Sequence, residues 1–221
     1  MYKSQILLAL IVFLLSSAYI VTAQTDSFDC SKPGNPKVNK LVIRALAFEE
    51  EYDFESAIKT NKQILTIEPK NYCALNTIAG LYGILENFEE ERVYAMRAIE
   101  INPKFANAYI NLGNAQSMLG EIEEGEKSFK KAGELDPKSP IPAYSLGIIA
   151  EEKGDLNEAA KFYETSVFID PGFENGYLNL AAVYANLKRF EDAKSALKKL
   201  LALNPDAEDA KDMLATIEKE P

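Results

Sequence analysis

Prolines recur in this chain at a constant interval of 34 residues, at Pro69, Pro103, Pro137, Pro171 and Pro205. Bulky apolar residues keep the same interval at Phe54, Phe88, Ile122, Leu156 and Phe190. Small residues do so at Ala45, Ala79, Gly113, Gly147 and Ala181. A fixed period of this size predicts a stack of similar structural units instead of one closed globule.

Each unit is expected to contain two amphipathic helices, because apolar residues recur at helical spacing between the prolines. In the clearest unit the helices are expected at about Ala106–Leu119 and Ile122–Leu135, with Gly120 in the turn and Gly154 in the turn of the next unit. The small residues let the paired helices approach closely. The proline ends each unit because it cannot continue a helix interior.

This pattern resembles the tetratricopeptide repeat family, and Asn107–Pro137 is close to the family consensus. The resemblance implies an all-α fold, a right-handed α-solenoid of five helix hairpins with a C-terminal capping helix. The expected boundaries are a signal peptide or anchor at 1–23, a linker at 24–37, repeats at 38–71, 72–105, 106–139, 140–173 and 174–207, and the capping helix at 208–221.

Departures from the pattern mark the ends and one packing problem. Arg44 and Asn61 occupy positions that are apolar in later repeats, as expected of a terminal repeat. Glu91 stands where other repeats have a small residue, so close packing in the second repeat is in question.

Residues 1–23 form a separate segment with Lys3 near the start, the apolar run 6–15 and small residues before Gln24. This is typical of a secretory signal peptide cleaved between Ala23 and Gln24, which predicts an exported protein, periplasmic or secreted. The alternative is an uncleaved anchor in the inner membrane, since residues 6–23 reach the lower limit for a span. A membrane contact is expected only if residues 1–23 are retained.

The two cysteines, Cys30 in the linker and Cys73 in the second repeat, allow two interpretations. In an oxidising compartment they invite a disulfide that folds the linker over the first repeat. The other interpretation is two independent thiols.

Composition argues against several function classes. There is no histidine, which removes the common histidine-based catalytic systems and zinc sites. The chain has no glycine-rich phosphate loop, and its net charge of −10 without a basic run does not suit nucleic acid. We therefore expect no enzyme activity, no catalytic residues, no cofactor and no metal site.

First helices of the repeats are expected to line a concave face, where such solenoids usually bind partners. The candidate peptide-binding residues on this face are Asn76, Asn107, Asn111, Asn114, Tyr144, Ser145, Asn175 and Asn179. Asn111 and Asn179 occupy equivalent positions with Ser145 between them, similar to the asparagine ladder with which some members of the family hold a peptide backbone. The competing interpretation is that these asparagines only solvate their helices.

The leading hypothesis for function is a non-enzymatic scaffold of the bacterial cell envelope that binds a protein or peptide segment on this face. The alternative is a membrane-tethered structural or assembly subunit that contacts partners through its ends. A third hypothesis is a self-associating solenoid without a dedicated ligand. The sequence leaves the oligomeric state and the identity of the partner open.

Overall fold

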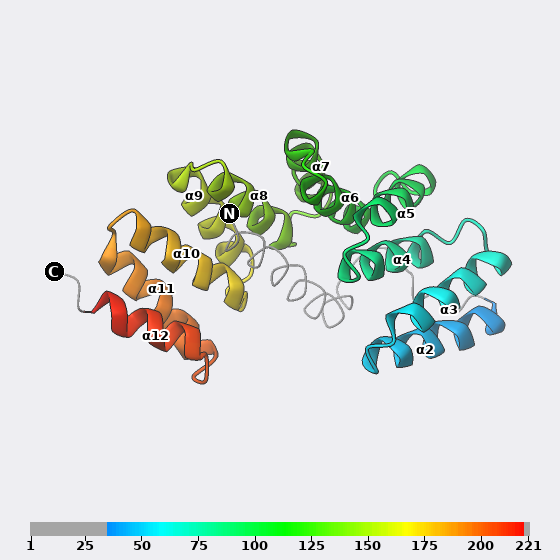
Figure 1. Ribbon diagram of the computed structural model, residues 1–221, viewed down its shortest axis with the longest axis horizontal. Coiled ribbons are helices and arrows are strands. Elements are labelled where there is room, and N and C mark those ends of the chain that lie inside the picture. The colour runs from blue at the N-terminus through cyan, green and yellow to red at the C-terminus, as the bar shows by residue number, and fades with distance from the viewer. Residues whose placement is uncertain (1–34, 219–221) are drawn as a thin grey trace. The chain divides into compact units, whose positions relative to one another are not determined.

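The computed structural model describes residues 35–218, which form helices without any strand (Figure 1). The expected all-α tetratricopeptide-type solenoid class is thereby confirmed. Residues 1–23, most of the linker and the last three residues lie outside the described part of the chain.

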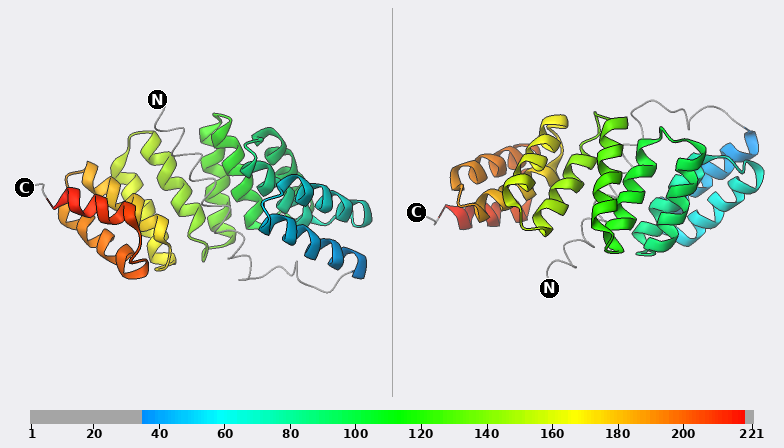
Figure 2. Two further views of the ribbon diagram at one scale, coloured as in Figure 1. Left: turned by 60° about the horizontal axis from the view of Figure 1, so that its bottom comes forward. Right: turned by 90° about the horizontal axis from the view of Figure 1, so that it is seen from above.

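The helices fall into two compact units that divide between Gly125 and Glu126. Helices of the first unit are α2 (Pro36–Glu50), α3 (Phe54–Ile67), α4 (Tyr72–Ile84), α5 (Phe88–Ile101) and α6 (Ala106–Met118). The division falls inside α7 (Ile122–Leu135). Helices of the second unit are α8 (Ile141–Glu152), α9 (Leu156–Ile169), α10 (Glu174–Asn186), α11 (Phe190–Leu203) and α12 (Glu208–Ile217). Within each unit, consecutive helices pack against each other (Figure 2).

The sequence period sets the helix boundaries. The second helix of every hairpin begins at a residue of the bulky apolar column, and ends at the aliphatic residue two positions before the proline. The helices expected in the clearest repeat are found at Ala106–Met118 and Ile122–Leu135. α8 begins at Ile141 with Pro142 in its first turn, where a missing backbone N–H costs nothing.

The turn inside each hairpin has one backbone conformation. Its φ is positive, between 56° and 85°, at positions that are again 34 apart: Tyr52, Glu86, Gly120, Gly154 and Lys188. The next amide donates to the carbonyl five residues back, as Asn87 N does to Tyr82 O at 2.9 Å. This Schellman arrangement satisfies carbonyls at the end of the first helix.

In three hairpins the side chain of the residue after the positive φ caps the second helix. Side-chain oxygens of Asp53, Asn87 and Asp155 accept from the backbone N–H three residues later, at 3.1, 3.3 and 2.9 Å. These bonds satisfy donors at the start of the helix. The turn between the two helices of a hairpin therefore needs only three residues, such as 51–53 between α2 and α3.

Helix pairs approach closely at small residues. A Cβ added to Gly147 of α8 would lie 2.5 Å from the fully buried ring of Tyr163 on α9. A Cβ added to Gly83 of α4 would lie 2.8 Å from the carboxylate of Glu91 on α5. The packing question that Glu91 raised is thus resolved, because the glycine on the facing helix makes the space.

Glu91 is buried, and both of its carboxylate oxygens accept from Asn114 Nδ2 of α6 at 3.0 Å. Burial raises the pKa of Glu91 well above its usual value, and the bond from Asn114 opposes this effect.

Glu49, on α2, holds the hairpin position that Gly83 holds in the next repeat, and it is 8 % exposed. Its Oε1 is buried without a hydrogen-bond partner in the described residues. The residue 34 positions before Asn114 is Gly80, which has no side chain to donate a hydrogen bond. Burial raises the pKa of Glu49 to about 7.

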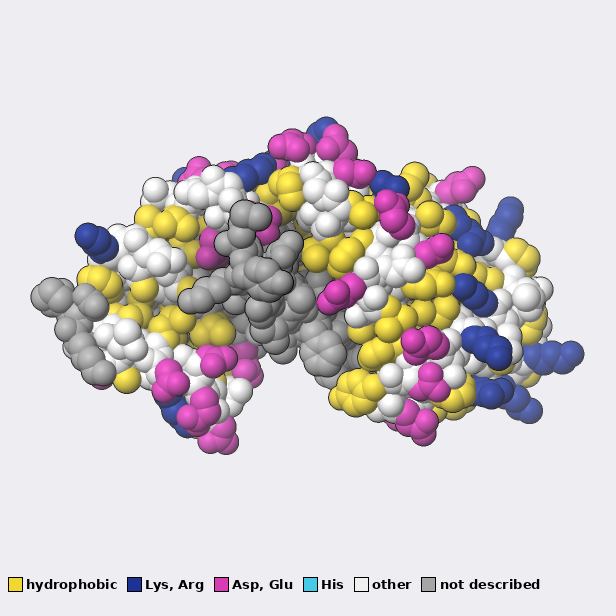
Figure 3. All heavy atoms as spheres, in the orientation of Figure 1, with side chains coloured by type: hydrophobic (Ala, Val, Ile, Leu, Met, Phe, Trp, Pro, Cys, Tyr) yellow, Lys and Arg dark blue, Asp and Glu magenta, His cyan; other side chains and the backbone are white. Residues whose placement is uncertain are grey.

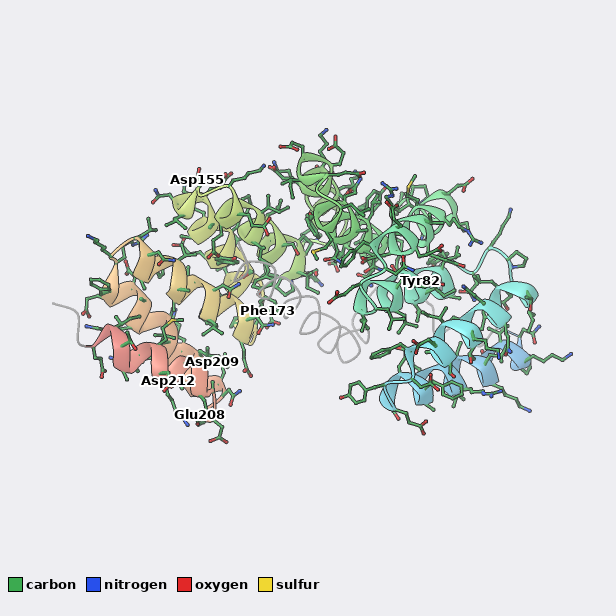
Figure 4. The ribbon with its side chains drawn as sticks, in the orientation of Figure 1. Tyr82, Asp155, Phe173, Glu208, Asp209 and Asp212 are labelled. Atoms are coloured by element: carbon green, nitrogen blue, oxygen red, sulfur yellow. The ribbon has the colours of Figure 1, made fainter. Side chains whose placement is uncertain are left out.

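The last helix closes the described chain. α12 packs on α11, with Ala210 and Ile217 buried. The acidic residues Glu208, Asp209 and Asp212 are exposed along it (Figure 4). This arrangement agrees with the expected capping helix.

The positive φ in the turns leads to paired substitutions with opposite effects. We expect Gly120→Ala to lower the free energy of unfolding by about 1 kcal/mol, because a Cβ disfavours this conformation. Lys188→Gly should raise it by several tenths of a kcal/mol, since Lys188 is exposed and already carries that strain. Urea unfolding followed by circular dichroism measures both, and equal signs would contradict the explanation.

Glu49 makes stability depend on pH. In the folded state Glu49 keeps its proton up to about pH 7, whereas in the unfolded chain it loses the proton near the ordinary glutamate pKa of 4.5. The free energy of unfolding is therefore highest below pH 4.5 and falls as the pH rises from there toward 7. Glu49→Gln should therefore be more stable than wild type at about pH 8, by at most about 3 kcal/mol, and similar at about pH 4. Thermal unfolding over this range is the measurement.

The matched control is Glu50→Gln, which changes an exposed glutamate on the same helix. It should leave the pH profile of unfolding unchanged. A Glu49→Gln profile parallel to wild type would show that Glu49 is ionised in the folded protein.

Candidate functional site

The candidate binding residues all lie on first helices of hairpins, as expected. Asn76 of α4 and three residues of α6 belong to the first unit, namely Asn107, Asn111 and Asn114. Tyr144 and Ser145 of α8 and Asn175 and Asn179 of α10 belong to the second unit.

In the first unit, two of the asparagines are bonded to each other. Asn111 Nδ2 donates to the backbone oxygen of Asn76 at 3.2 Å and to its Oδ1 at 3.0 Å. Both side chains are 7 % exposed. Asn114 donates to Glu91, as described above, and Asn107 is half-buried in the first turn of α6.

In the second unit, the equivalent bond joins an asparagine to a tyrosine. Asn179 Nδ2 donates to Tyr144 Oη at 3.0 Å and lies 3.5 Å from Tyr163 Oη. The Tyr144 ring meets Phe173 edge-on at 5.1 Å between centroids, and Tyr163 Oη donates to Glu151 Oε2 at 3.1 Å. Ser145 is buried, and Asn175 is half-buried.

These two bonds share one register. Asn111 reaches back 35 residues to Asn76, and Asn179 reaches back 35 residues to Tyr144. In both units the bond joins first helices of neighbouring hairpins. Because the amide nitrogen donates within the protein, the orientation of each amide is fixed.

Burial determines the charge of the tyrosine cluster. The pKa values of Tyr144 and Tyr163 are both raised, chiefly by desolvation, so both rings keep their hydroxyl proton at neutral pH. Burial also raises the pKa of Glu151, against the hydrogen bond from Tyr163. The cluster therefore consists of neutral, buried tyrosines whose hydroxyl groups hydrogen-bond within the protein.

Other sequence-based expectations lie partly outside the described residues. Cys73 is disulfide-bonded, but Cys30 is not described, so their pairing stays a prediction. The cleavage site at Ala23 and Gln24 also lies outside. Among residues 35–218 no cluster of three metal-binding side chains occurs, and none of the helices there has the length and apolarity of a membrane span.

Sequence reasoning did not identify the buried carboxylates or Tyr163 as parts of these networks. Only the comparison of positions 34 residues apart pointed to one of them, because Glu91 is acidic where the other repeats have a small residue. Glu49 gave no such signal, because its equivalents are as different as Gly83, Ser117, Glu151 and Ala185.

Comparison with known proteins agrees with the fold. Sequence models of the tetratricopeptide repeat match residues 74–105, 94–127 and 150–217. A comparison with curated proteins found no match.

Several solved structures are similar to this chain. A thermophilic tetratricopeptide repeat protein of Thermus thermophilus has a TM-score of 0.70 and 16 % identity, with 82 % of this chain and 98 % of that chain covered. MamA has a TM-score of 0.60 and 22 % identity, covering 76 % and 92 %. YrrB, a tetratricopeptide repeat protein with an unusual peptide-binding site, has a TM-score of 0.56 and 18 % identity, covering 89 % and 96 %.

The repeated helix boundaries, the shared turn geometry and the three matching sequence models lead to one conclusion: the chain belongs to the tetratricopeptide repeat family.

Proposed function

We propose that this protein is a non-enzymatic scaffold that binds a polypeptide segment against the first helices of its hairpins. The observation that carries the proposal is the repeated bond from Asn111 to Asn76 and from Asn179 to Tyr144. It fixes one side-chain amide in each unit, and the oxygen of that amide is the atom that we propose accepts from a backbone N–H of an extended peptide.

Membership of the family and the similarity to YrrB, described as having a peptide-binding site, support this proposal. The surroundings of Asn179 also support it, because Asn179 is half-buried and the half-buried ring of Phe173 packs against Tyr144, the partner of the amide. A catalytic role finds no support in the composition, since the chain has no histidine.

We further propose that the protein acts in the bacterial cell envelope after export. The support is the apolar segment 6–15 followed by small residues before Gln24. Nucleic acid is not a proposed partner, because the net charge is −10.

The test has two steps. A partner is first captured from envelope extracts with the wild-type chain, and its affinity for the purified protein is then measured by calorimetry. We expect Asn111→Ala combined with Asn179→Ala to weaken this affinity roughly tenfold or more, through the loss of two hydrogen bonds.

Asn157→Ala is the matched control, since Asn157 is an exposed asparagine on α9, a second helix. It should leave the affinity unchanged, and circular dichroism should show both variants folded. An unaltered affinity in the double variant would refute binding through the amides.

The mass of the recovered wild-type chain tests export. A chain that begins at Gln24 agrees with cleavage. A chain that retains Met1 or Tyr2, together with unaltered affinity in the double variant, would instead favour a membrane-tethered assembly subunit.

A further inference from the structure

α2 exposes an apolar stripe. Val42, Ile43 and Leu46 are 39 %, 68 % and 48 % exposed, and lie within one face of the helix at positions three and four apart. Glu49, which is 8 % exposed, lies three residues further along the helix at the edge of this stripe. We refer to Val42, Ile43, Leu46 and Glu49 as the α2 stripe.

The α2 stripe is not the surface on which a preceding repeat would stack. In α4, the residues that pack on the preceding hairpin are Ala74, Ile78 and Leu81. Their equivalents 34 positions earlier are Lys40, Arg44 and Ala47, which are exposed and mostly charged. The stacking face of α2 is therefore already suited to solvent, as a terminal repeat requires.

The α2 stripe instead corresponds to the face that carries the amides. The equivalents of Val42, Ile43 and Leu46 in α4 are Asn76, Thr77 and Gly80. Asn76 is the partner of Asn111, so this is the face that we propose for binding a polypeptide. In the first hairpin the same face is apolar and exposed.

Charge on α2 opposes its own helix dipole. Lys37 and Lys40 lie toward its start, while Glu50 is its last residue and follows Glu49, which keeps its proton up to about pH 7. Cations at the start and anions at the end of a helix are both unfavourable. Acidic side chains gather over the end of α2 and basic ones over its start (Figure 3). Helix stability therefore does not explain the glutamates.

Glu49 supplies the second observation. Its side chain is more than nine-tenths buried, and Oε1 lacks a hydrogen-bond partner in the described residues. Side chains on a helix lean toward its N-terminus, which carries Glu49 toward Leu46. The apolar stripe is thus bordered by a carboxyl group that lacks a donor.

We propose that the α2 stripe binds a segment of a partner polypeptide in which apolar side chains are followed by a lysine or arginine. The apolar side chains cover Val42, Ile43 and Leu46, and the basic group donates to Glu49. The net charge of −10 also favours a basic partner. This inference rests on the proposed function and names the chemistry of its ligand.

The experiment uses two labelled synthetic peptides and the full chain. One peptide carries three leucines followed by two lysines, and in the other norleucine replaces both lysines. Fluorescence anisotropy should show tighter binding of the lysine peptide. Leu46→Asp should weaken both by about tenfold or more, as expected for losing the burial of one leucine.

Glu49→Gln should weaken the lysine peptide alone, to about the affinity of the norleucine peptide. Met96→Asp is the matched control, because Met96 is 55 % exposed on α5. It should change neither affinity, and circular dichroism should show all variants folded.

Three results would overturn the inference. If the lysine peptide does not bind, or binds Leu46→Asp as well as it binds wild type, the α2 stripe is not the binding site. The proposed function is then still tested by whether the affinity of the captured partner depends on Asn111 and Asn179. If the chain self-associates and Leu46→Asp abolishes this, the occupant is a second copy. If neither the peptides nor any captured polypeptide binds, both proposals fail.

Discussion

Close approach of two helices within each hairpin is the constraint on which the rest of this structure depends. Gly147 and Gly83 show how little space is left at the crossing, since a Cβ at either would meet Tyr163 or Glu91 below 3 Å. Interiors packed this densely accept a large side chain only opposite a small one. The large residue, Tyr163 or Glu91, is then fixed in position, and its polar group lies near an asparagine of the next hairpin.

Polar networks follow from that arrangement. Tyr163 fills the space beside Gly147, and its hydroxyl lies near Glu151 and Asn179. Glu91 fills the space beside Gly83 and accepts from Asn114 of the next hairpin. Glu49 shows the same principle incompletely, because Gly80 provides no donor. A buried acceptor without a partner costs free energy, and the proposed basic ligand would provide the missing donor.

Much of the fold could be predicted from the period alone. The column at Phe54, Phe88, Ile122, Leu156 and Phe190 marks the first residue of every second helix. The turns were predicted only where they contain Gly120 and Gly154. Tyr52, Glu86 and Lys188 adopt the same positive φ, because the two flanking helices impose it whatever the residue. Local sequence could not reveal that.

Site residues were predictable in position but not in bonding. The asparagines were placed on first helices by their register. That Asn111 and Asn179 use their amide nitrogens internally depends on residues 35 positions away, and the acceptor differs between the two, an asparagine and a tyrosine. The unpartnered state of Glu49 depends on the absence of a side chain at Gly80, which composition and helical spacing do not reveal.

The charged exterior of α12 also determines how this architecture could grow. Its inner side covers α11 through Ala210 and Ile217, while Glu208, Asp209 and Asp212 are exposed. Another hairpin added after α12 would have to desolvate carboxylates. Gene duplication or engineering that lengthens the protein is therefore expected to insert whole 34-residue segments upstream of Glu208, so that the terminal helix is preserved and moved outward as a unit.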